Sequence, residues 1–210
     1  MEKGIKNIIF DLGGVLIDLD TDRCLREFKA LGVSNVEELV NSTHTAGVFS
    51  ALEHGKVSPA EFRDEIRRLA GNPELTDAQI DNAWLSILLE IPQKKLDLLL
   101  RLNRKYRVFL LSNTNEIHFD WILRTQFEKD GHRLSDYFEQ CFLSHKMGLA
   151  KPEDEIFEEV INEAQIFARE TLYIDDSEKN LNASLNWCFN TYCAAPGEDL
   201  APLFENLVNE

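Results

Sequence analysis

Four clusters of polar residues lie at the ends of apolar, strand-like runs or in the loops beside them. The clusters are Asp11, Ser112-Asn113, Lys151-Pro152 and Asp175-Asp176. A carboxylate can attack phosphorus, a hydroxyl and an amide can bind phosphate oxygens, a lysine can neutralise their charge, and paired carboxylates can hold a metal ion. The four clusters together therefore indicate phosphoryl-transfer chemistry.

Each cluster taken alone has a simpler structural explanation. An aspartate after a strand is commonly a turn former, and Ser112-Asn113-Thr114-Asn115 would make a good helix N-cap. Lys151-Pro152 could belong to an ordinary loop that enters a helix, and Asp175-Asp176 could serve only as a cap. The occurrence of all four in order along one chain favours the functional interpretation.

Short apolar runs predict the strands that would position these residues. Residues 5–10, 107–111, 138–143 and 172–174 are such runs, and amphipathic helical patterns separate most of them. This alternation predicts an α/β fold with a parallel sheet covered by helices on both faces. The carboxyl ends of parallel strands share one edge of the sheet, so the polar clusters should meet in one crevice there.

The segment between the first two strands has helical patterns throughout. Ser58-Pro59-Ala60-Glu61 and Thr76-Asp77 are typical helix starts within it. We therefore expect a three-layer, Rossmann-like core of residues 1–18 and 90–210. A small all-helical cap of residues 19–89 would be inserted after the first strand.

The charge and hydropathy of the chain exclude several classes of partner. The formal net charge of −15 opposes binding to nucleic acid or to anionic lipid. No apolar run is long enough to cross a bilayer, and the N-terminus has no pattern of a cleavable signal. We expect a cytoplasmic protein, a monomer or a weak dimer, whose partner is a small molecule.

The cysteines and histidines give no independent sign of a site. The four cysteines lack the paired spacing of a zinc site, and buried reduced thiols are expected at Cys24, Cys141, Cys188 and Cys193. Surface or loop positions are expected for His118, His132 and His145. His44 and His54 fall in the insert, where solvated positions are favoured over places in a pocket wall.

The four clusters and their order resemble the motifs of the haloacid dehalogenase superfamily. The similar segments are Phe10-Asp11-Leu12-Gly13-Gly14-Val15, Leu111-Ser112-Asn113-Thr114-Asn115, Lys151-Pro152 and Ile174-Asp175-Asp176-Ser177. The resemblance covers essentially the whole chain. Residues 111–115 and 52–58 are most similar to glucose-1-phosphatase-like members and to the N-terminal phosphatase domain of epoxide hydrolases.

This resemblance implies a phosphatase that forms an aspartyl-phosphate on Asp11. Ser112 and the backbone amide of Asn113 would bind phosphate oxygens, and Lys151 would neutralise the charge shared by the nucleophile and the phosphate. The substrate would be a small phosphate monoester, with sugar phosphates favoured because a small helical cap closes over compact molecules.

The resemblance also implies a bound Mg²⁺ ion. Its ligands would be the Asp11 carboxylate, the backbone carbonyl of Gly13 and a carboxylate from Asp175 or Asp176. Asp176 aligns more naturally with the direct ligand of the family, which leaves Asp175 as a supporting or water-mediated partner.

Gly13 departs from the usual family pattern, in which a second aspartate donates a proton to the leaving oxygen. Its absence leaves open an inactive binding domain. In an active enzyme, the charge on the leaving oxygen would be carried by the leaving group itself, by water or by a cap residue such as His54. A 2-haloacid dehalogenase, which needs neither a proton donor nor magnesium, is a further alternative. The Asp175-Asp176 pair argues against it, because it would place uncompensated negative charge beside the nucleophile.

Overall fold

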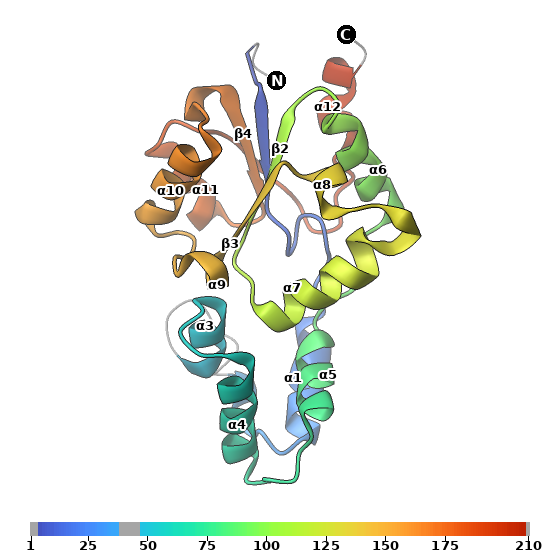
Figure 1. Ribbon diagram of the computed structural model, residues 1–210, viewed down its shortest axis with the longest axis vertical. Helices are drawn as coiled ribbons and strands as arrows, with labels where there is room; N and C mark the ends of the chain where they lie inside the picture. Colours follow the sequence, from blue (N-terminus) through green and yellow to red (C-terminus); the bar gives the residue numbers. More distant parts are fainter. Residues whose placement is uncertain (1–3, 38–46, 209–210) are drawn as a thin grey trace.

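The structure is a computed structural model that describes residues 4–37 and 47–208, so His44 lies outside the described part of the chain. A sheet of five parallel strands in the order β3-β2-β1-β4-β5 forms its centre (Figure 1). The strands are β1 (Asn7–Phe10), β2 (Arg107–Ser112), β3 (Gln140–Leu143), β4 (Thr171–Asp175) and β5 (Asn190–Cys193). The expected parallel α/β core is confirmed.

Helices cover both faces of the sheet because successive side chains along the strands point to opposite faces, and both faces carry apolar residues. Ile9, Phe109 and Tyr173 pack in one cluster with residues of α10 (Asp154–Ala164) and α11 (Glu178–Leu185). Ile8 and Phe10 belong to a second cluster with residues of α6 (Gln93–Leu102) and α12 (Ala201–Val208). Figure 1 shows these two helix pairs on opposite sides of the sheet.

Short elements complete the connections around the core. They are α7 (Glu116–Ile122), η1 (Leu123–Phe127), η2 (Lys129–Gly131), α8 (Leu134–Tyr137), α9 (Ser144–Met147) and η3 (Ala168–Glu170). None of the helices in the described ranges is both long and apolar enough to cross a membrane.

Strand β5 was not expected from the sequence. Within the described residues it pairs only with β4, at the edge of the sheet, and its four residues are half-buried or exposed. Its short polar sequence therefore carries a weak strand signal. The expectation of buried thiols is also wrong for Cys188 and Cys193, which are exposed, whereas Cys24 is buried and Cys141 is half-buried.

The insert forms a separate group of helices below the sheet in Figure 1. Its helices are α1 (Thr21–Ala30), α3 (Gly47–Glu53), α4 (Pro59–Ala70) and α5 (Asp77–Leu85). The predicted starts of α4 and α5 are confirmed, and each has a capping box, at Ser58 and at Thr76. Phe49 contacts the rings of Phe28, Phe62 and Trp84 and so joins the helices of the insert around one aromatic core.

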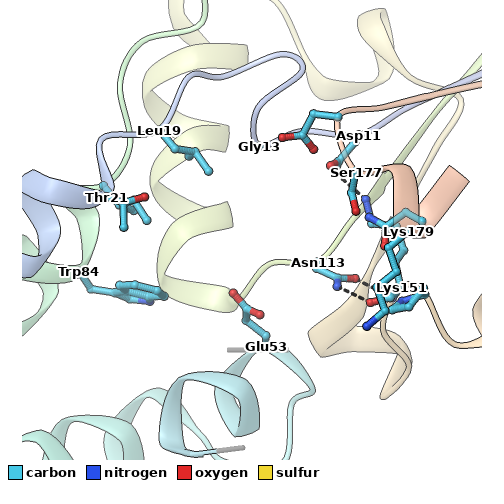
Figure 2. Close-up of a pocket in the computed structure, with 14 residues that line it drawn as sticks. Asp11, Gly13, Leu19, Thr21, Glu53, Trp84, Asn113, Lys151, Ser177 and Lys179 are labelled. Atoms are coloured by element: carbon cyan, nitrogen blue, oxygen red, sulfur yellow. Dashed lines mark hydrogen bonds and ion pairs between the residues drawn. The ribbon is translucent and has the colours of Figure 1, made fainter. Parts of the chain in front are cut away.

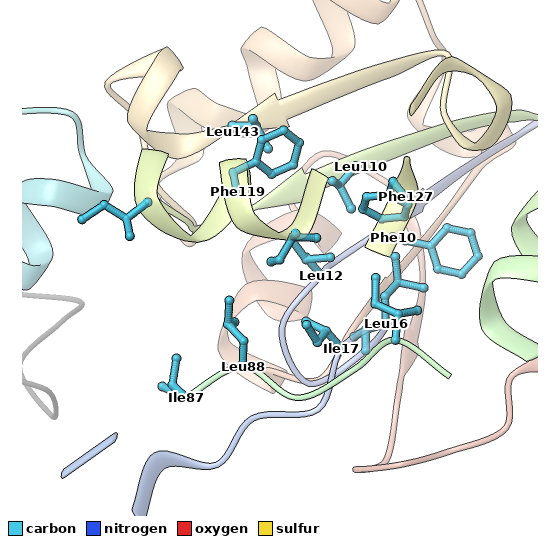
Figure 3. Close-up of a cluster of buried hydrophobic side chains, with 14 of the residues drawn as sticks. Phe10, Leu12, Leu16, Ile17, Ile87, Leu88, Leu110, Phe119, Phe127 and Leu143 are labelled. Carbon is cyan, nitrogen blue, oxygen red and sulfur yellow. The ribbon is translucent and has the colours of Figure 1, made fainter. Parts of the chain in front are cut away.

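The two chain segments that join the insert to the sheet lie side by side. The backbone N–H of Asp20 donates to the carbonyl of Ile87 at 2.7 Å, and that of Leu89 donates to the carbonyl of Asp18 at 3.1 Å. Figure 3 shows the cluster of apolar side chains around this crossing, which includes Leu12, Leu16, Ile17, Leu88 and Phe119. The loop that carries Asp11 and Gly13 is therefore packed against the entrance of the insert.

Candidate active site

Asp11 directly follows β1, which is the central strand of the sheet. Its backbone N–H continues the ladder by donating to Ile174 at 2.9 Å, so the residue is fixed relative to β4. Its Oδ1 accepts hydrogen bonds from the Leu12 N–H at 2.7 Å and lies 2.8 Å from Lys151 Nζ. Burial raises the pKa of Asp11 to about 7, although the Lys151 ammonium opposes the shift.

Lys151 joins three strands of the sheet at its carboxyl edge. Its Nζ lies 2.8 Å from both Asp11 and Asp175, and it donates to the Leu111 carbonyl at 3.1 Å. The side chain is only 1% exposed. Burial opposes its charge, but the two carboxylates outweigh burial and raise the pKa of Lys151. The lysine therefore stays cationic at the centre of the site.

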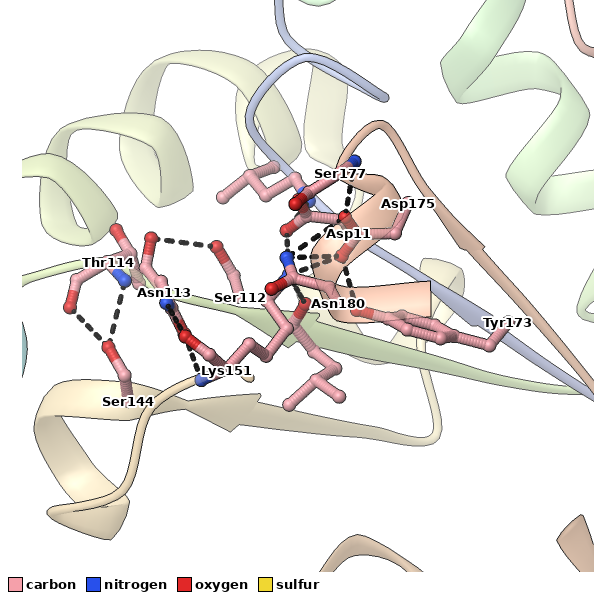
Figure 4. A network of polar contacts seen from close by, with 12 residues as sticks. Asp11, Ser112, Asn113, Thr114, Ser144, Lys151, Tyr173, Asp175, Ser177 and Asn180 are labelled. Carbon is pink, nitrogen blue, oxygen red and sulfur yellow. Dashed lines mark hydrogen bonds and ion pairs between the residues drawn. The ribbon is translucent and has the colours of Figure 1, made fainter. Parts of the chain in front are cut away.

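The Asp175 carboxylate is completely buried and is surrounded by hydrogen-bond donors (Figure 4). Its Oδ1 accepts from the Ser177 N–H at 2.8 Å and from Asn180 Nδ2 at 3.0 Å. Its Oδ2 accepts from Lys151 at 2.8 Å and from the Tyr173 hydroxyl. Burial opposes ionisation, but Lys151 and the hydrogen bonds outweigh it and lower the pKa of Asp175.

Asp176 is exposed and lines the cavity above the site, in contrast to its neighbour. Burial of part of the carboxyl group and the charge of Asp175 raise its pKa. Gly14 lies directly against it: a Cβ atom at Gly14, whose φ is +76°, would be 2.1 Å from Asp176 Oδ2. Glycine is therefore required at position 14 for Asp176 to occupy this place.

Asn113 and Lys151 hold their two loops together. Asn113 Nδ2 donates to the Lys151 carbonyl at 2.9 Å, and the Lys151 N–H donates to Asn113 Oδ1 at 2.8 Å. Ser112 is 2% exposed, and among the described residues its hydroxyl makes only a long contact of 3.4 Å with the Asn113 carbonyl. The hydroxyl thus keeps most of its hydrogen-bonding capacity, and it lies beside the loop that faces the cavity.

A cavity of about 490 Å³ lies between the sheet edge and the insert (Figure 2). Of the residues expected at the site, Asp11, Gly13, Asn113, Lys151 and Asp176 line it, whereas Ser112 and Asp175 lie behind its wall. Residues of the insert and its entrance form the other side. They include Leu19, Thr21, Glu53, Trp84 and Ile87.

Several residues of the site were missed by sequence reasoning. Tyr173 lies two residues before Asp175 in β4, so the two-residue period of a strand could have placed both side chains on one face. Asn180 and Lys179 lie in the first turns of α11, after the acidic pair. Glu53 comes from α3, and no local pattern connects it with Asp11.

His118 contradicts the expectation of a surface or loop position. It is 7% exposed, its ring stacks on Trp84 at 4.2 Å between centroids, and its Nε2 lies 3.2 Å from the Trp84 carbonyl. Burial lowers the pKa of His118 to about 3. His132 is 42% exposed, as expected, and His145 is half-buried in α9. His54 is also half-buried and lies near Glu153, 3.6 Å away.

The donor set at this edge of the sheet suits a hard divalent cation. Carboxylate oxygens of Asp11, Asp175 and Asp176 lie within 4.8 Å of one another. The single ammonium group of Lys151 cannot balance three carboxylates. Oxygen ligands in a cluster with excess negative charge are those that Mg²⁺ prefers.

Known proteins resemble this chain over nearly its full length. Residues 5–184 match the family model described as a haloacid dehalogenase-like hydrolase. A D-ribitol-5-phosphate phosphatase from Bacteroides thetaiotaomicron is 37% identical over 195 residues, which are 93% of this chain and 94% of the relative.

Solved structures show the same similarity. A haloacid dehalogenase family enzyme from Bacteroides thetaiotaomicron, in complex with magnesium and inorganic phosphate, has a TM-score of 0.91 and 48% identity and covers 96% of this chain and 100% of its own. A HAD-like family hydrolase from Porphyromonas gingivalis has a TM-score of 0.90 and 40% identity over 99% of both chains. A dehalogenase matches at a TM-score of 0.67 with 15% identity over 100% of both chains, which shows a shared fold alone.

Proposed function

The chain belongs to the haloacid dehalogenase-like hydrolases, and we propose that it is a magnesium-dependent phosphatase that hydrolyses a small phosphate monoester through an aspartyl-phosphate on Asp11. One observation carries the proposal: Asp11 faces a cavity with Lys151 on one of its carboxylate oxygens and with Asp176 beside it. This arrangement can supply a nucleophile, a fixed positive charge and a cation site within one pocket.

The nucleophile and the phosphate are both anions, so the site must offset their repulsion. Lys151 lies against Asp11 at 2.8 Å and can also contact a phosphate oxygen that approaches the same carboxylate. Asn113 lines the cavity, and its backbone amide and the Ser112 hydroxyl are the donors that we assign to the other phosphate oxygens. These groups are preorganised by the paired hydrogen bonds between Asn113 and Lys151.

Mg²⁺ would be held by the Asp11 carboxylate, the Gly13 carbonyl and the Asp176 carboxylate. Asp175 is less suited to direct contact, because Lys151, Tyr173, Ser177 and Asn180 already donate to its oxygens. We assign it to orienting Lys151 and the start of α11 instead. The ion would supply a second positive charge against the phosphate when bound.

The substrate class rests on the similarity to a relative, and the cavity wall adds an aromatic side chain, Trp84. Trp84 is 2% exposed, and its Nε1 has no hydrogen-bond partner among the described residues, although a buried indole N–H usually has one. The nitrogen is itself shielded from the cavity, so Trp84 offers a substrate the apolar part of its ring and not its N–H. The similarity to a D-ribitol-5-phosphate phosphatase points to the same substrate class, a sugar or sugar-alcohol phosphate.

We place the cap that closes this cavity at residues 19–89 and the core at residues 1–18 and 90–210. The paired backbone at Asp18–Asp20 and Ile87–Leu89 supports these limits, because both crossings between the two parts lie there. Glu53 and Trp84 then belong to the cap and the phosphate site to the core.

A panel of phosphorylated metabolites tests the proposal. We expect hydrolysis of sugar-alcohol and sugar phosphates with Mg²⁺, D-ribitol 5-phosphate among them, and loss of activity in chelator. Ca²⁺ should inhibit, because its larger coordination number would draw both Asp11 oxygens onto the ion. Full activity after rigorous metal removal, or activity on 2-haloacids instead of phosphate esters, would contradict the proposal.

A further inference from the structure

The proposed reaction needs a proton donor that the loop after β1 does not contain. When the P–O bond of an alkyl phosphate breaks, the leaving oxygen becomes a strongly basic alkoxide unless it receives a proton. Position 13 is glycine, and the nearest side-chain atom to a Cβ there is the tip of Leu19, at 3.2 Å. A donor must therefore come from another part of the cavity wall.

The geometry of phosphoryl transfer indicates which part of the wall this is. The attacking and leaving oxygens lie roughly in line on opposite sides of phosphorus. A phosphate attacked by Asp11 therefore directs its leaving oxygen across the cavity, away from the sheet edge. Figure 2 shows the Glu53 side chain pointing into the cavity from the opposite side, between Trp84 and Asn113.

Glu53 has the properties of an acid in this place. Burial raises the pKa of its carboxyl group to about 8, so the group is protonated at neutral pH. No other described residue forms an ion pair or a side-chain hydrogen bond with this carboxyl group. A neutral carboxylic acid can approach a phosphate dianion without repulsion and donate a hydrogen bond to it.

The core fixes the backbone of Glu53 close to the phosphate site. Ser144 is completely buried, and its hydroxyl lies 2.6 Å from the Glu53 carbonyl and 3.0 Å from the Thr114 carbonyl. Thr114 also donates its N–H to this hydroxyl, at 2.9 Å. One serine thus connects the end of α3 to the loop that carries Ser112 and Asn113.

We propose that Glu53 is the general acid that protonates the leaving oxygen, in place of the carboxylic acid that Gly13 cannot supply. The inference rests on the proposed phosphatase function. A bond forms between an Asp11 oxygen and phosphorus while the ester P–O bond breaks, and the Glu53 proton passes to the leaving oxygen. The Glu53 carboxylate then takes a proton from the water that attacks phosphorus, which releases Asp11 and orthophosphate.

His54, the donor suggested by the sequence, is less well placed. Its Nδ1 lies 2.8 Å from the Ser50 carbonyl, and its Nε2 lies 3.6 Å from Glu153. It lines a smaller neighbouring hollow and not the cavity that contains Asp11. Both ring nitrogens are therefore directed to partners outside the path of the leaving group.

Single-turnover release of the leaving group in Glu53→Gln tests the proposal. Glutamine keeps the size of the side chain but is not an acid. We expect release from a sugar-alcohol phosphate to slow by about 10²–10⁴-fold. Release of 4-nitrophenolate from its phosphate ester should change little, because this leaving group needs no proton. His54→Gln is the matched control and should affect neither ester.

If folded Glu53→Gln releases the leaving group of both esters more slowly by the same factor, the proposal is contradicted and Glu53 has a binding role. An unchanged rate with the alkyl ester, or a selective loss in His54→Gln, would also contradict it. The wild type gives a second test: release from the alkyl ester should fall as the pH rises through about 8, where Glu53 ionises, and that from the aryl ester should not. If the wild type hydrolyses neither ester, the proposed function itself fails.

Discussion

Lys151 places a single ammonium group 2.8 Å from the carboxylates of both Asp11 and Asp175. Asp176 adds a third carboxylate within 4.8 Å of the others. The local charge is therefore negative before any substrate arrives, and an anionic phosphate would increase it. A cation at Asp176 resolves this imbalance, and Gly14 is the residue that leaves room for Asp176.

Gly14→Ala should weaken magnesium activation. The new Cβ would lie 2.1 Å from Asp176 Oδ2 and must displace this carboxylate. We expect the Mg²⁺ concentration for half-maximal activity to rise by about 10–100-fold. Gly148→Ala is the control, because Gly148 has a similar φ of +69° and no atom within 4 Å of its Cβ position. Equal Mg²⁺ requirements in the two variants would show that Asp176 does not hold the ion.

His118 should make the free energy of unfolding depend on pH. Its pKa is about 3 in the folded protein and 6.5 in a model peptide, so between these values the unfolded chain binds more protons. The contribution of neutral His118 is therefore complete above pH 6.5 and is lost as the pH falls.

Urea unfolding of the wild type and His118→Phe measures this contribution. Phenylalanine keeps the stacking on Trp84 but cannot titrate. As the pH falls from about 7.5 to about 5, the free energy of unfolding of the wild type should decrease by about 2 kcal/mol relative to that of His118→Phe. A difference that is independent of pH would mean that the pKa of His118 is not lowered in the folded state.

At the scale of elements, α9 contacts the turn that follows α3, and this contact determines where Glu53 lies. Gly55 has a φ of +64°, and a Cβ there would be 2.2 Å from the His145 carbonyl oxygen. Only glycine allows this approach, which accompanies the Ser144 hydrogen bond to Glu53. The cap and the core thus meet through backbone groups next to the proposed acid.

Gly55→Ala should reduce both stability and activity, and Gly71→Ala is its matched control. Gly71 has nearly the same φ, +63°, but no atom within 4 Å of its Cβ position. Each alanine should cost about 1–2 kcal/mol for its left-handed backbone. Only Gly55→Ala should also lower kcat/KM for an alkyl phosphate, because it pushes α3 away from α9. Equal kcat/KM values in both variants would contradict this account of the contact.

The sequence predicted those elements and residues that follow from local patterns. Asp11, Asn113 and Asp176 could be found because each follows a strand with a clear apolar signal, and parallel strands bring such positions together. Strand β5 lacks that signal, since it is a half-exposed edge. Glu53 could not be found, because its place in the cavity depends on a hydrogen bond to Ser144, 91 residues away.

At the scale of the whole molecule, the net charge of −15 repels a phosphate ester over most of the surface. Lys151 and Lys179 provide positive charge among the described residues that line the cavity. The attraction for the substrate is therefore concentrated between the cap and the sheet edge. There the nucleophile, the proposed acid and the cation site face one volume of about 490 Å³.

Trapping the covalent intermediate tests the central claim most directly. Borohydride reduces an acyl phosphate, so an aspartyl-phosphate formed during turnover becomes homoserine at that position. Protein mixed with Mg²⁺ and a sugar-alcohol phosphate, quenched with borohydride and digested, should show homoserine at residue 11 by peptide mass spectrometry. Protein treated without substrate should show none. Homoserine at Asp176 or another carboxylate, or none anywhere during active turnover, would contradict Asp11 as the nucleophile.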